Sequence, residues 1–397
     1  NLIDHDNPYG PQALKYTLQD ASFFDNKYYI YYNPLPVITL YIPLYALFKK
    51  IPTDNLILTL LSIAYGLIIL ALSVFLNYKK NITLGLIFFS AALFNPIFLN
   101  SFNWFVSSNV SRYYCIIALI LSYALIFSVK SDKTLSKKDY CLIFLSILFA
   151  TLASFTRQTF LIDLIMLLLF IFYKFHIYRK LKFLLLSFFP FVILFLLNSY
   201  YNFIRFGNFL ENGQKYIVNG QDYITNGSIL RIPYNLFEFF ANYLYRFYEY
   251  FMLLPSYDYE TSKIMLNKST SPYMLHHNYS EGTIGIFYYV PVLLPLLFLF
   301  FKISYENIHI KKINSEILVV YLTFIGFILN FFLISLVPNT TIFYTSEFYL
   351  RFLIFLFFFI YFLYDVKNRL FNNIVILLLI IGLFHMFNLS RATWLHL

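Results

Sequence analysis

Long apolar stretches recur along most of this 397-residue chain, and each approaches the length that a helix needs to cross a bilayer. That length is about 20 predominantly apolar residues. The sequence is 60% hydrophobic and 12% charged, roughly half the charged share of a soluble chain. We therefore predict an all-α polytopic integral membrane protein with about ten transmembrane helices, at residues 55–76, 83–100, 113–129, 140–156, 159–175, 181–198, 284–303, 315–337, 348–365 and 372–388.

Residues 34–48 (PLPVITLYIPLYALF) are apolar enough to enter a membrane but too short to cross it. Pro34, Pro36 and Pro43 each remove a helix hydrogen-bond donor and restrict the preceding residue. The segment is predicted to be an interfacial or re-entrant helix. The stretches 140–156 and 159–175 are joined by a few residues around Arg157, which predicts a tight helical hairpin.

Basic residues gather in short loops at one end of the expected helices, as in Lys79–Lys80, Lys137–Lys138 and Lys311–Lys312. The positive-inside rule predicts that this end is cytoplasmic, in the plasma (inner) membrane. The first polar segment then lies on the outer side, and we expect one more helix before Asn1 to carry it across. The net charge of +10 thus reflects orientation, and no nucleic-acid partner is predicted.

This topology divides the chain into four regions. Residues 1–54 form a first extracytoplasmic loop that ends in the helix at 34–48, 55–198 hold transmembrane helices, 199–283 form a second extracytoplasmic loop, and 284–397 hold the C-terminal helices. Within the second loop, 233–254 mixes aromatics with Arg246 and Glu249. We expect it to lie at the interface as an amphipathic helix, with a further charge-bearing span as the alternative.

The residues of the first loop resemble a known family. Asp4-His5-Asp6, followed by a Tyr-rich strip and by Asn33-Pro34-Leu35-Pro36, is similar to the first outer loop of GT-C-type glycosyltransferases. That group includes the protein O-mannosyltransferases and the lipid A aminoarabinose transferases, whose loop carries an acidic motif before a proline-rich helix. Residues 201–208 (YNFIRFGN) resemble a stretch found in its bacterial envelope members. The family motif is Asp-Glu where this chain has Asp-His-Asp or Asp-Asn.

The resemblance implies a polyprenyl-phosphate sugar donor, an envelope glycan, lipid or protein acceptor, and a site on the extracytoplasmic face. Such transfer needs a carboxylate to accept a proton and cations to stabilise the departing phosphate. Asp6 is the expected base and Asp4 the next candidate. Both also fit a solvated loop or a helix cap. The expected donor phosphate-binding residues are Arg205, Arg351, Arg157 and Lys15, and the expected sugar- or acceptor-binding residues are Tyr28, Tyr29 and Tyr32.

Several of these residues also have structural interpretations. Arg205 could pair with Glu211 or contact a lipid headgroup. Arg351 near the start of a span requires a partner, a phosphate ligand, or a path to the interface. Asp163 is expected to pair with Arg157. The tyrosine strip is equally typical of interfacial anchoring.

No cofactor is predicted, although a divalent metal stays an open alternative. Cys115 and Cys141 make no metal-ligand or redox spacing, and His276-His277 has no ligand at metal spacing. The alternative to an enzyme is a lipid-linked-glycan flippase or polymerase, or another non-catalytic envelope membrane protein. A flippase is expected to line its helices with paired charges, whereas the expected spans here are nearly free of charge except near their outer ends.

Overall fold

The computed structural model describes residues 21–25, 27–30, 34–80, 82–93, 106–129, 135–175, 181–211, 213, 236–254, 256–258, 263–265, 286–309, 315–335, 342–363, 373–374, 377–378 and 380–382. Asp4, Asp6, Lys15, Tyr32 and His276-His277 lie outside these residues. Of Tyr28 only the backbone is described.

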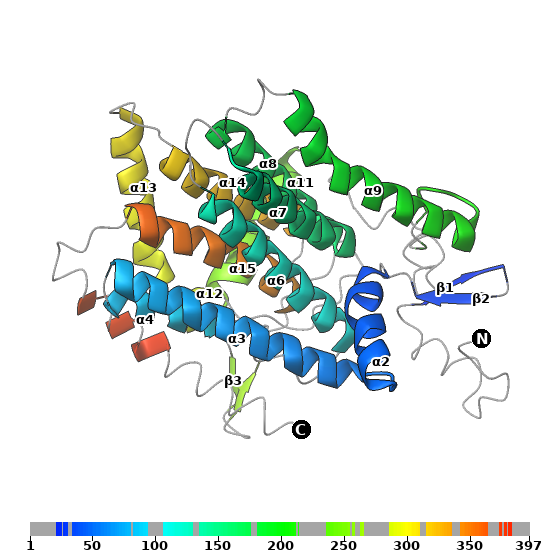
Figure 1. The fold of residues 1–397 in the computed structure, drawn as a ribbon. Coiled ribbons are helices and arrows are strands. Elements are labelled where there is room, and N and C mark those ends of the chain that lie inside the picture. The colour runs from blue at the N-terminus through cyan, green and yellow to red at the C-terminus, as the bar shows by residue number, and fades with distance from the viewer. Residues whose placement is uncertain are drawn as a thin grey trace.

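The described chain is mainly helical (Figure 1). Its α-helices are α2 (Ile42–Phe48), α3 (Asp54–Lys79), α4 (Ile82–Leu93), α6 (Val106–Ser128), α7 (Lys137–Thr156), α8 (Leu161–Phe175), α9 (Leu181–Phe206), α11 (Leu236–Phe247), α12 (Ile286–Tyr289), α13 (Leu293–His309), α14 (Ser315–Ser335) and α15 (Ile342–Phe358). The 3₁₀ turn η2 is Gln158–Phe160, and the π-helical turns are η1 (Val37–Tyr41), η5 (Tyr248–Met252) and η6 (Phe359–Leu363).

Two small antiparallel hairpins accompany the helices, and the sequence patterns did not predict them. β1 (Ala21–Phe24) pairs with β2 (Lys27–Ile30) so that Phe23 lies opposite Tyr28. β3 (Ser256–Asp258) pairs with β4 (Lys263–Met265). Strands of three or four residues are too short for the alternation of apolar and polar residues to be recognised in the sequence.

Six helical segments in the described part of the chain are long and apolar enough to cross a membrane. They are Asp54–Lys79, Val110–Ser128, Lys137–Thr156, Gln158–Phe175, Phe188–Phe206 and Ser315–Ile334. The prediction of a helical membrane protein is therefore confirmed. Each of the other expected spans also overlaps a described helix, except 372–388, of which only a few residues are described.

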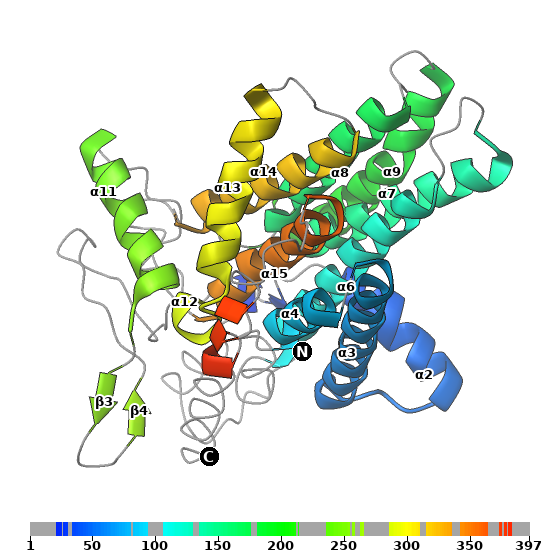
Figure 2. The ribbon, with the colours of Figure 1, turned by 90° about the vertical axis from the view of Figure 1, so that its left-hand side faces the viewer.

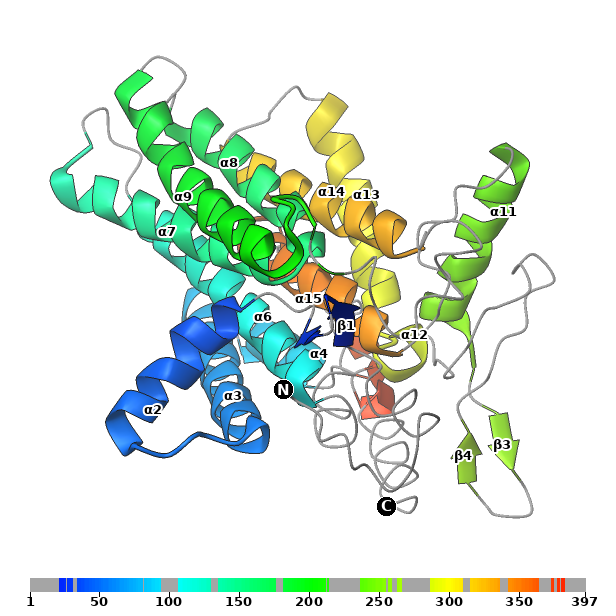
Figure 3. The same ribbon diagram turned by 90° about the vertical axis from the view of Figure 1, so that its right-hand side faces the viewer.

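The segment 34–48 forms η1 and α2, a short helix that follows Pro34 and ends at Lys49 in a left-handed conformation. Figures 2 and 3 show α2 set at an angle to α3 at the edge of the bundle. Thr53 then caps α3 by accepting a hydrogen bond from the backbone N–H of Leu56 (3.3 Å). Short proline-containing helices of this kind end before they can cross a bilayer.

The predicted hairpin around Arg157 is also present. Ser136 and Asp139 form a capping box that starts α7, and Arg157 adopts an extended backbone that ends it. The turn η2 then leads into α8. Helix α6 packs against α3 and α7, while α8 packs against α14.

Aromatic side chains fill much of the core. Phe300 of α13, Phe324 of α14 and Phe355 of α15 form a triangle whose ring centroids are 4.7, 4.9 and 5.0 Å apart. Such contacts combine large apolar burial with favourable ring geometry. Gly85 allows α4 to approach α3 closely, because a Cβ there would lie 2.7 Å from the backbone oxygen of Ser73.

Candidate functional site

The β1–β2 hairpin of the first loop lies against the C-terminal end of α9. The ring of Tyr29 meets that of Phe206 edge to face at a centroid distance of 5.4 Å, and Phe24 meets the same ring at 5.8 Å. In Figure 1 the hairpin lies beyond the end of α9. Segments more than 170 residues apart in the sequence therefore meet next to Arg205, the residue that precedes Phe206.

Arg205 belongs to a helix, whereas the sequence placed it in the loop that begins at residue 199. The stretch 199–206 continues α9, so the helix is about two turns longer than the predicted span. Because polar residues are mixed with aromatics here, the hydropathy of this stretch is too low to predict a membrane-spanning helix. Gly207 ends it with a φ of 66°, and its N–H donates to the carbonyl of Phe203 (2.8 Å).

The guanidinium of Arg205 is buried in an aromatic setting. Its Cζ lies 4.0 Å from the ring centroid of Tyr201 and 4.7 Å from that of Phe206, and its Nη2 donates to Oδ1 of Asn202 (2.8 Å). A cation in the last turn of a helix is favoured by the helix dipole, and stacking on rings suits the planar guanidinium. Glu211, the alternative partner expected from sequence, accepts a hydrogen bond from the N–H of Gly213 (2.9 Å).

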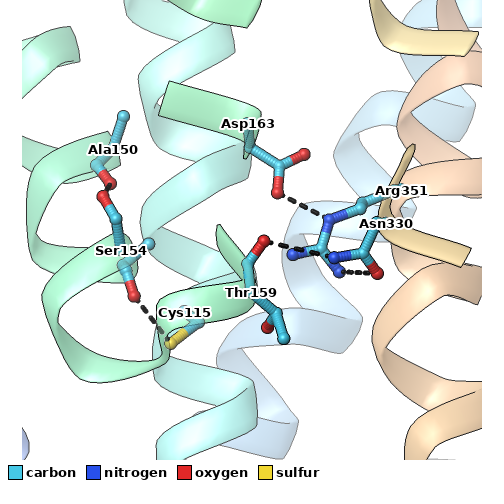
Figure 4. A network of polar contacts seen from close by, with 8 residues as sticks. Cys115, Ala150, Ser154, Thr159, Asp163, Asn330 and Arg351 are labelled. Atoms are coloured by element: carbon cyan, nitrogen blue, oxygen red, sulfur yellow. Dashed lines mark hydrogen bonds and ion pairs between the residues drawn. The ribbon is translucent and has the colours of Figure 1, made fainter. Parts of the chain in front are cut away.

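A second predicted cation, Arg351, is held in a buried polar cluster (Figure 4). Its Nε donates to Oδ2 of Asp163 at 2.6 Å, and its Nη1 donates to Oδ1 of Asn330 at 2.8 Å. Asn330 in turn donates from Nδ2 to the carbonyl of Thr159 (3.2 Å), and the ring of Phe160 lies 4.1 Å from the Arg351 Cζ. The cluster thus joins η2, α8, α14 and α15.

This cluster decides between the interpretations of Arg351. The Arg351 side chain is 1% exposed, and the carboxylate of Asp163 neutralises its charge. Of the three interpretations given above for Arg351, the structure therefore shows the one with a protein partner. Asp163 pairs with Arg351 and not, as predicted, with Arg157. Arg157 is half-buried, and its backbone joins α7 to η2 through hydrogen bonds with Ala153 and Phe160. Sequence spacing favoured the local pair, whereas the helix packing supplies a partner 188 residues away.

A second buried ion pair lies in α11 and η5. Nη1 of Arg246 donates to Oε2 of Glu249 at 3.0 Å, and these side chains are 2% and 0% exposed. Burial lowers the pKa of the Arg246 guanidinium, while burial and the neighbouring Glu249 carboxylate raise the pKa of Tyr245 to about 12. Opposite charges three residues apart lie on the same face of a helix, so the spacing of Arg246 and Glu249 in the sequence could have predicted this pair.

The segment 233–254, which was expected at the interface, is not among the six candidate membrane spans. Tyr243 and Phe251 pack their rings against Phe331 of α14 at centroid distances of 5.3 Å each. Figure 2 shows α11 at the periphery of the bundle. Arg246 and Glu249 face inward, whereas Phe240 and Leu244 are 58% and 65% exposed, so the outward face of this helix is apolar and its charges are buried.

The described residues contain no group of three or more His, Cys, Asp or Glu side chains that could hold a metal ion. Cys115 is buried and donates weakly to the carbonyl of Ala153 (3.4 Å), and Cys141 is exposed as a free thiol. Near Cys115 in Figure 4, the hydroxyl of Ser154 bonds to the carbonyl of Ala150 (2.7 Å), which is an ordinary intrahelical contact.

Comparisons with protein-family models, with curated proteins and with solved structures found no match to this chain.

Proposed function

We propose that this protein is an inverting, GT-C-like membrane glycosyltransferase that moves a sugar from a polyprenyl-phosphate donor to an envelope acceptor. The observation that supports the proposal best is the contact between the first-loop hairpin and the Arg205 end of α9 through Tyr29 and Phe206. The acidic pair Asp4 and Asp6 belongs to the same loop, and the two segments that resemble the family are those that carry this contact.

In the proposed reaction, the carboxylate of Asp6 accepts the proton of the acceptor hydroxyl, with Asp4 as the next candidate. The acceptor oxygen then bonds to the anomeric carbon of the donor from the face opposite the phosphate. The bond between that carbon and the phosphate oxygen breaks, its electron pair leaves with the polyprenyl phosphate, and the anomeric configuration inverts. Tyr29, with Tyr28 and Tyr32 of the same strip, would stack on the sugar ring.

Arg205 is assigned to the departing phosphate in preference to Arg351, because Arg351 already forms an ion pair with Asp163. A guanidinium offers a planar set of donors that matches phosphate oxygens. Apolar side chains beside Arg205 on α9 point outward, with Leu197 59%, Tyr200 61% and Ile204 62% exposed. They would receive the isoprenoid chain of the donor. Arg157 and Lys15 stay candidates for further phosphate contacts.

Replacement of the proposed base is the test of this chemistry. Asp6→Asn is expected to lower sugar transfer by about 10²–10⁴-fold, because the amide cannot accept the proton. The measurement is transfer of labelled sugar from a polyprenyl-phosphate donor by the full-length protein in membranes. Asp25→Asn is the matched control, since Asp25 is an exposed residue of the same loop at a φ of 50° that asparagine tolerates. Undiminished transfer in both Asp6→Asn and Asp4→Asn would remove the assignment.

We further propose ten membrane crossings in the plasma membrane, with the lysine-rich ends of the helices in the cytoplasm and the Arg205 end outside. Lys50 and Lys80 are exposed at opposite ends of α3. In a Cys141→Ser background, Lys50→Cys should react with an impermeant maleimide in intact cells, and Lys80→Cys only after permeabilisation. The reverse pattern would contradict the orientation.

A further inference from the structure

An apolar cavity of about 390 Å³ lies between α3, α4, α6 and α15. Aromatic rings dominate its walls, among them Tyr65 of α3, Phe88 of α4 and Phe358 of α15, and Phe160 lines it beside Arg351. An apolar cavity of about 150 Å³ stays dry and binds benzene, so this one would hold on the order of a dozen carbon atoms. The shape and chemistry suit a hydrocarbon chain.

The cavity accounts for an irregularity in α6. Most side chains of this central helix are buried, but Ala124 and Ser128 are exposed. They lie four residues apart on one face of the helix, and both line the cavity. The exposure of Ala124 therefore marks open space inside the bundle, and a larger side chain there would enter the cavity.

Aromatic residues line the side of the cavity between α3 and α15. The ring of Phe75 lies 5.4 Å from that of Tyr361 and 6.4 Å from that of Phe357, and Phe75 is 40% exposed. Tyr361 belongs to the π-helical turn η6, a backbone type that often occurs at functional sites. On α3 nearby, Leu70 and Val74 are also exposed, which is the surface that lipid would cover in a membrane.

Two lysines lie at this end of the cavity. Lys79 follows Phe75 by one helical turn on the same face of α3. The Nζ of Lys174 lies 5.4 Å from the ring centroid of Phe127, which lines the cavity, and donates to the carbonyls of Ile126 (3.4 Å) and Val129 (3.1 Å). An ammonium has three donors, so Lys174 retains one for a phosphate oxygen. Glu316 also lies within electrostatic range of Lys174.

This end is remote from Arg205. Phe172 of α8, two residues before Lys174, contacts Phe188 of α9 at a ring distance of 6.2 Å. Arg205 follows Phe188 along the same helix by about 25 Å at the α-helical rise of 1.5 Å per residue. The lysine end of the cavity and the proposed transfer site thus lie toward opposite ends of the bundle.

We propose that this cavity binds one acyl chain of an anionic phospholipid, which enters beside the exposed ring of Phe75 and places its phosphate near Lys79 and Lys174. The apolar walls would contact the acyl chain, and the two lysines would bind the negatively charged headgroup, as basic pockets between membrane helices do. The distance from Arg205 favours a resident phospholipid over the polyprenyl donor. The site goes beyond the proposed sugar transfer and stands without it.

The test is lipid retention by the full-length protein, measured by native mass spectrometry after incubation with phosphatidylglycerol and phosphatidylethanolamine of identical chains. The wild type should retain one phosphatidylglycerol in preference to phosphatidylethanolamine. Ala124→Trp, which fills the cavity, should lower this retention at least about tenfold. Ala71→Trp is the matched control, since Ala71 is exposed on α3 and does not line the cavity. Retention by Ala124→Trp at the wild-type level would overturn the proposal.

A second variant tests the headgroup without altering the cavity. Lys79 is exposed, and Lys79→Gln should reduce the preference for phosphatidylglycerol by roughly fivefold while leaving phosphatidylethanolamine retention unchanged. Equal retention of the two lipids by the wild type would contradict the anionic assignment. In an equimolar competition, displacement of phosphatidylglycerol by polyprenyl phosphate would reassign the cavity to the donor. Failure of sugar transfer would leave the outcome of each of these measurements unaffected.

Discussion

Asp163→Ala is expected to destabilise the protein by about 3–5 kcal/mol, because it leaves the buried Arg351 guanidinium without its counter-charge. Arg351 is 1% exposed, and its Nε lies 2.6 Å from the Asp163 carboxylate. Loss of this contact also loosens the connection between α8 and α15. The measurement is the free energy of unfolding, or the thermal midpoint, of the purified protein in a fixed detergent.

Two comparisons separate the charge effect from simple loss of packing. The double replacement Asp163→Leu with Arg351→Met should restore most of the stability, because apolar residues of similar size often replace a buried ion pair at little cost. Asp139→Ala, which removes a half-buried carboxylate from the capping box of α7, should cost only about 1 kcal/mol. A loss below about 1 kcal/mol for Asp163→Ala would mean that the pair does not hold the helices together.

The second large effect is expected at Arg205. Arg205→Ala should lower the turnover rate of sugar transfer by about 10²–10³-fold, because a positive charge aimed at the departing phosphate acts mainly in the transition state. Arg205→Lys should recover part of that loss, since it keeps the charge but lacks the planar set of donors. Both are measured as kcat and KM for the polyprenyl-phosphate donor.

A purely structural role for Arg205 gives a different pattern. Arg205 stacks on Tyr201 and bonds Asn202, so Asn202→Ala would disturb the same helix end while leaving the cation in place. If Arg205 acts on phosphate, Asn202→Ala should retain much more activity than Arg205→Ala at similar thermal stability. Equal activity in these two variants would reduce Arg205 to a packing residue.

The sequence predicts the helices of this protein well, because long apolar runs and proline positions report directly on local structure. Residues 34–48 and the turn at Arg157 are examples in which chain length and backbone chemistry decide the outcome. The extension of α9 through Arg205 was missed because its last two turns mix tyrosine and asparagine with apolar residues. Hydropathy does not distinguish such a helix end from a loop.

The partner of Asp163 depends on tertiary packing and not on spacing. Arg157 is nearer in the sequence, but α14 packs against both α8 and α15, and this packing brings Arg351 to the carboxylate. The cavity beside Ala124 is equally invisible in the sequence, because it arises from the distances between four helices. The contact between the first loop and the end of α9 at Tyr29 and Phe206 is also a product of tertiary packing, and Asp4 and Asp6 lie outside the described residues.

The most direct test of the proposed function uses the wild-type protein alone, purified at full length and reconstituted into phospholipid vesicles. Labelled sugar is supplied either on polyprenyl phosphate or on a nucleotide, and acceptor fractions from cell envelopes are examined for label. We predict transfer from the polyprenyl-phosphate donor and none from the nucleotide sugar. Folded protein that transfers no sugar from any polyprenyl-phosphate donor would contradict the proposed function and favour a lipid-linked-glycan flippase.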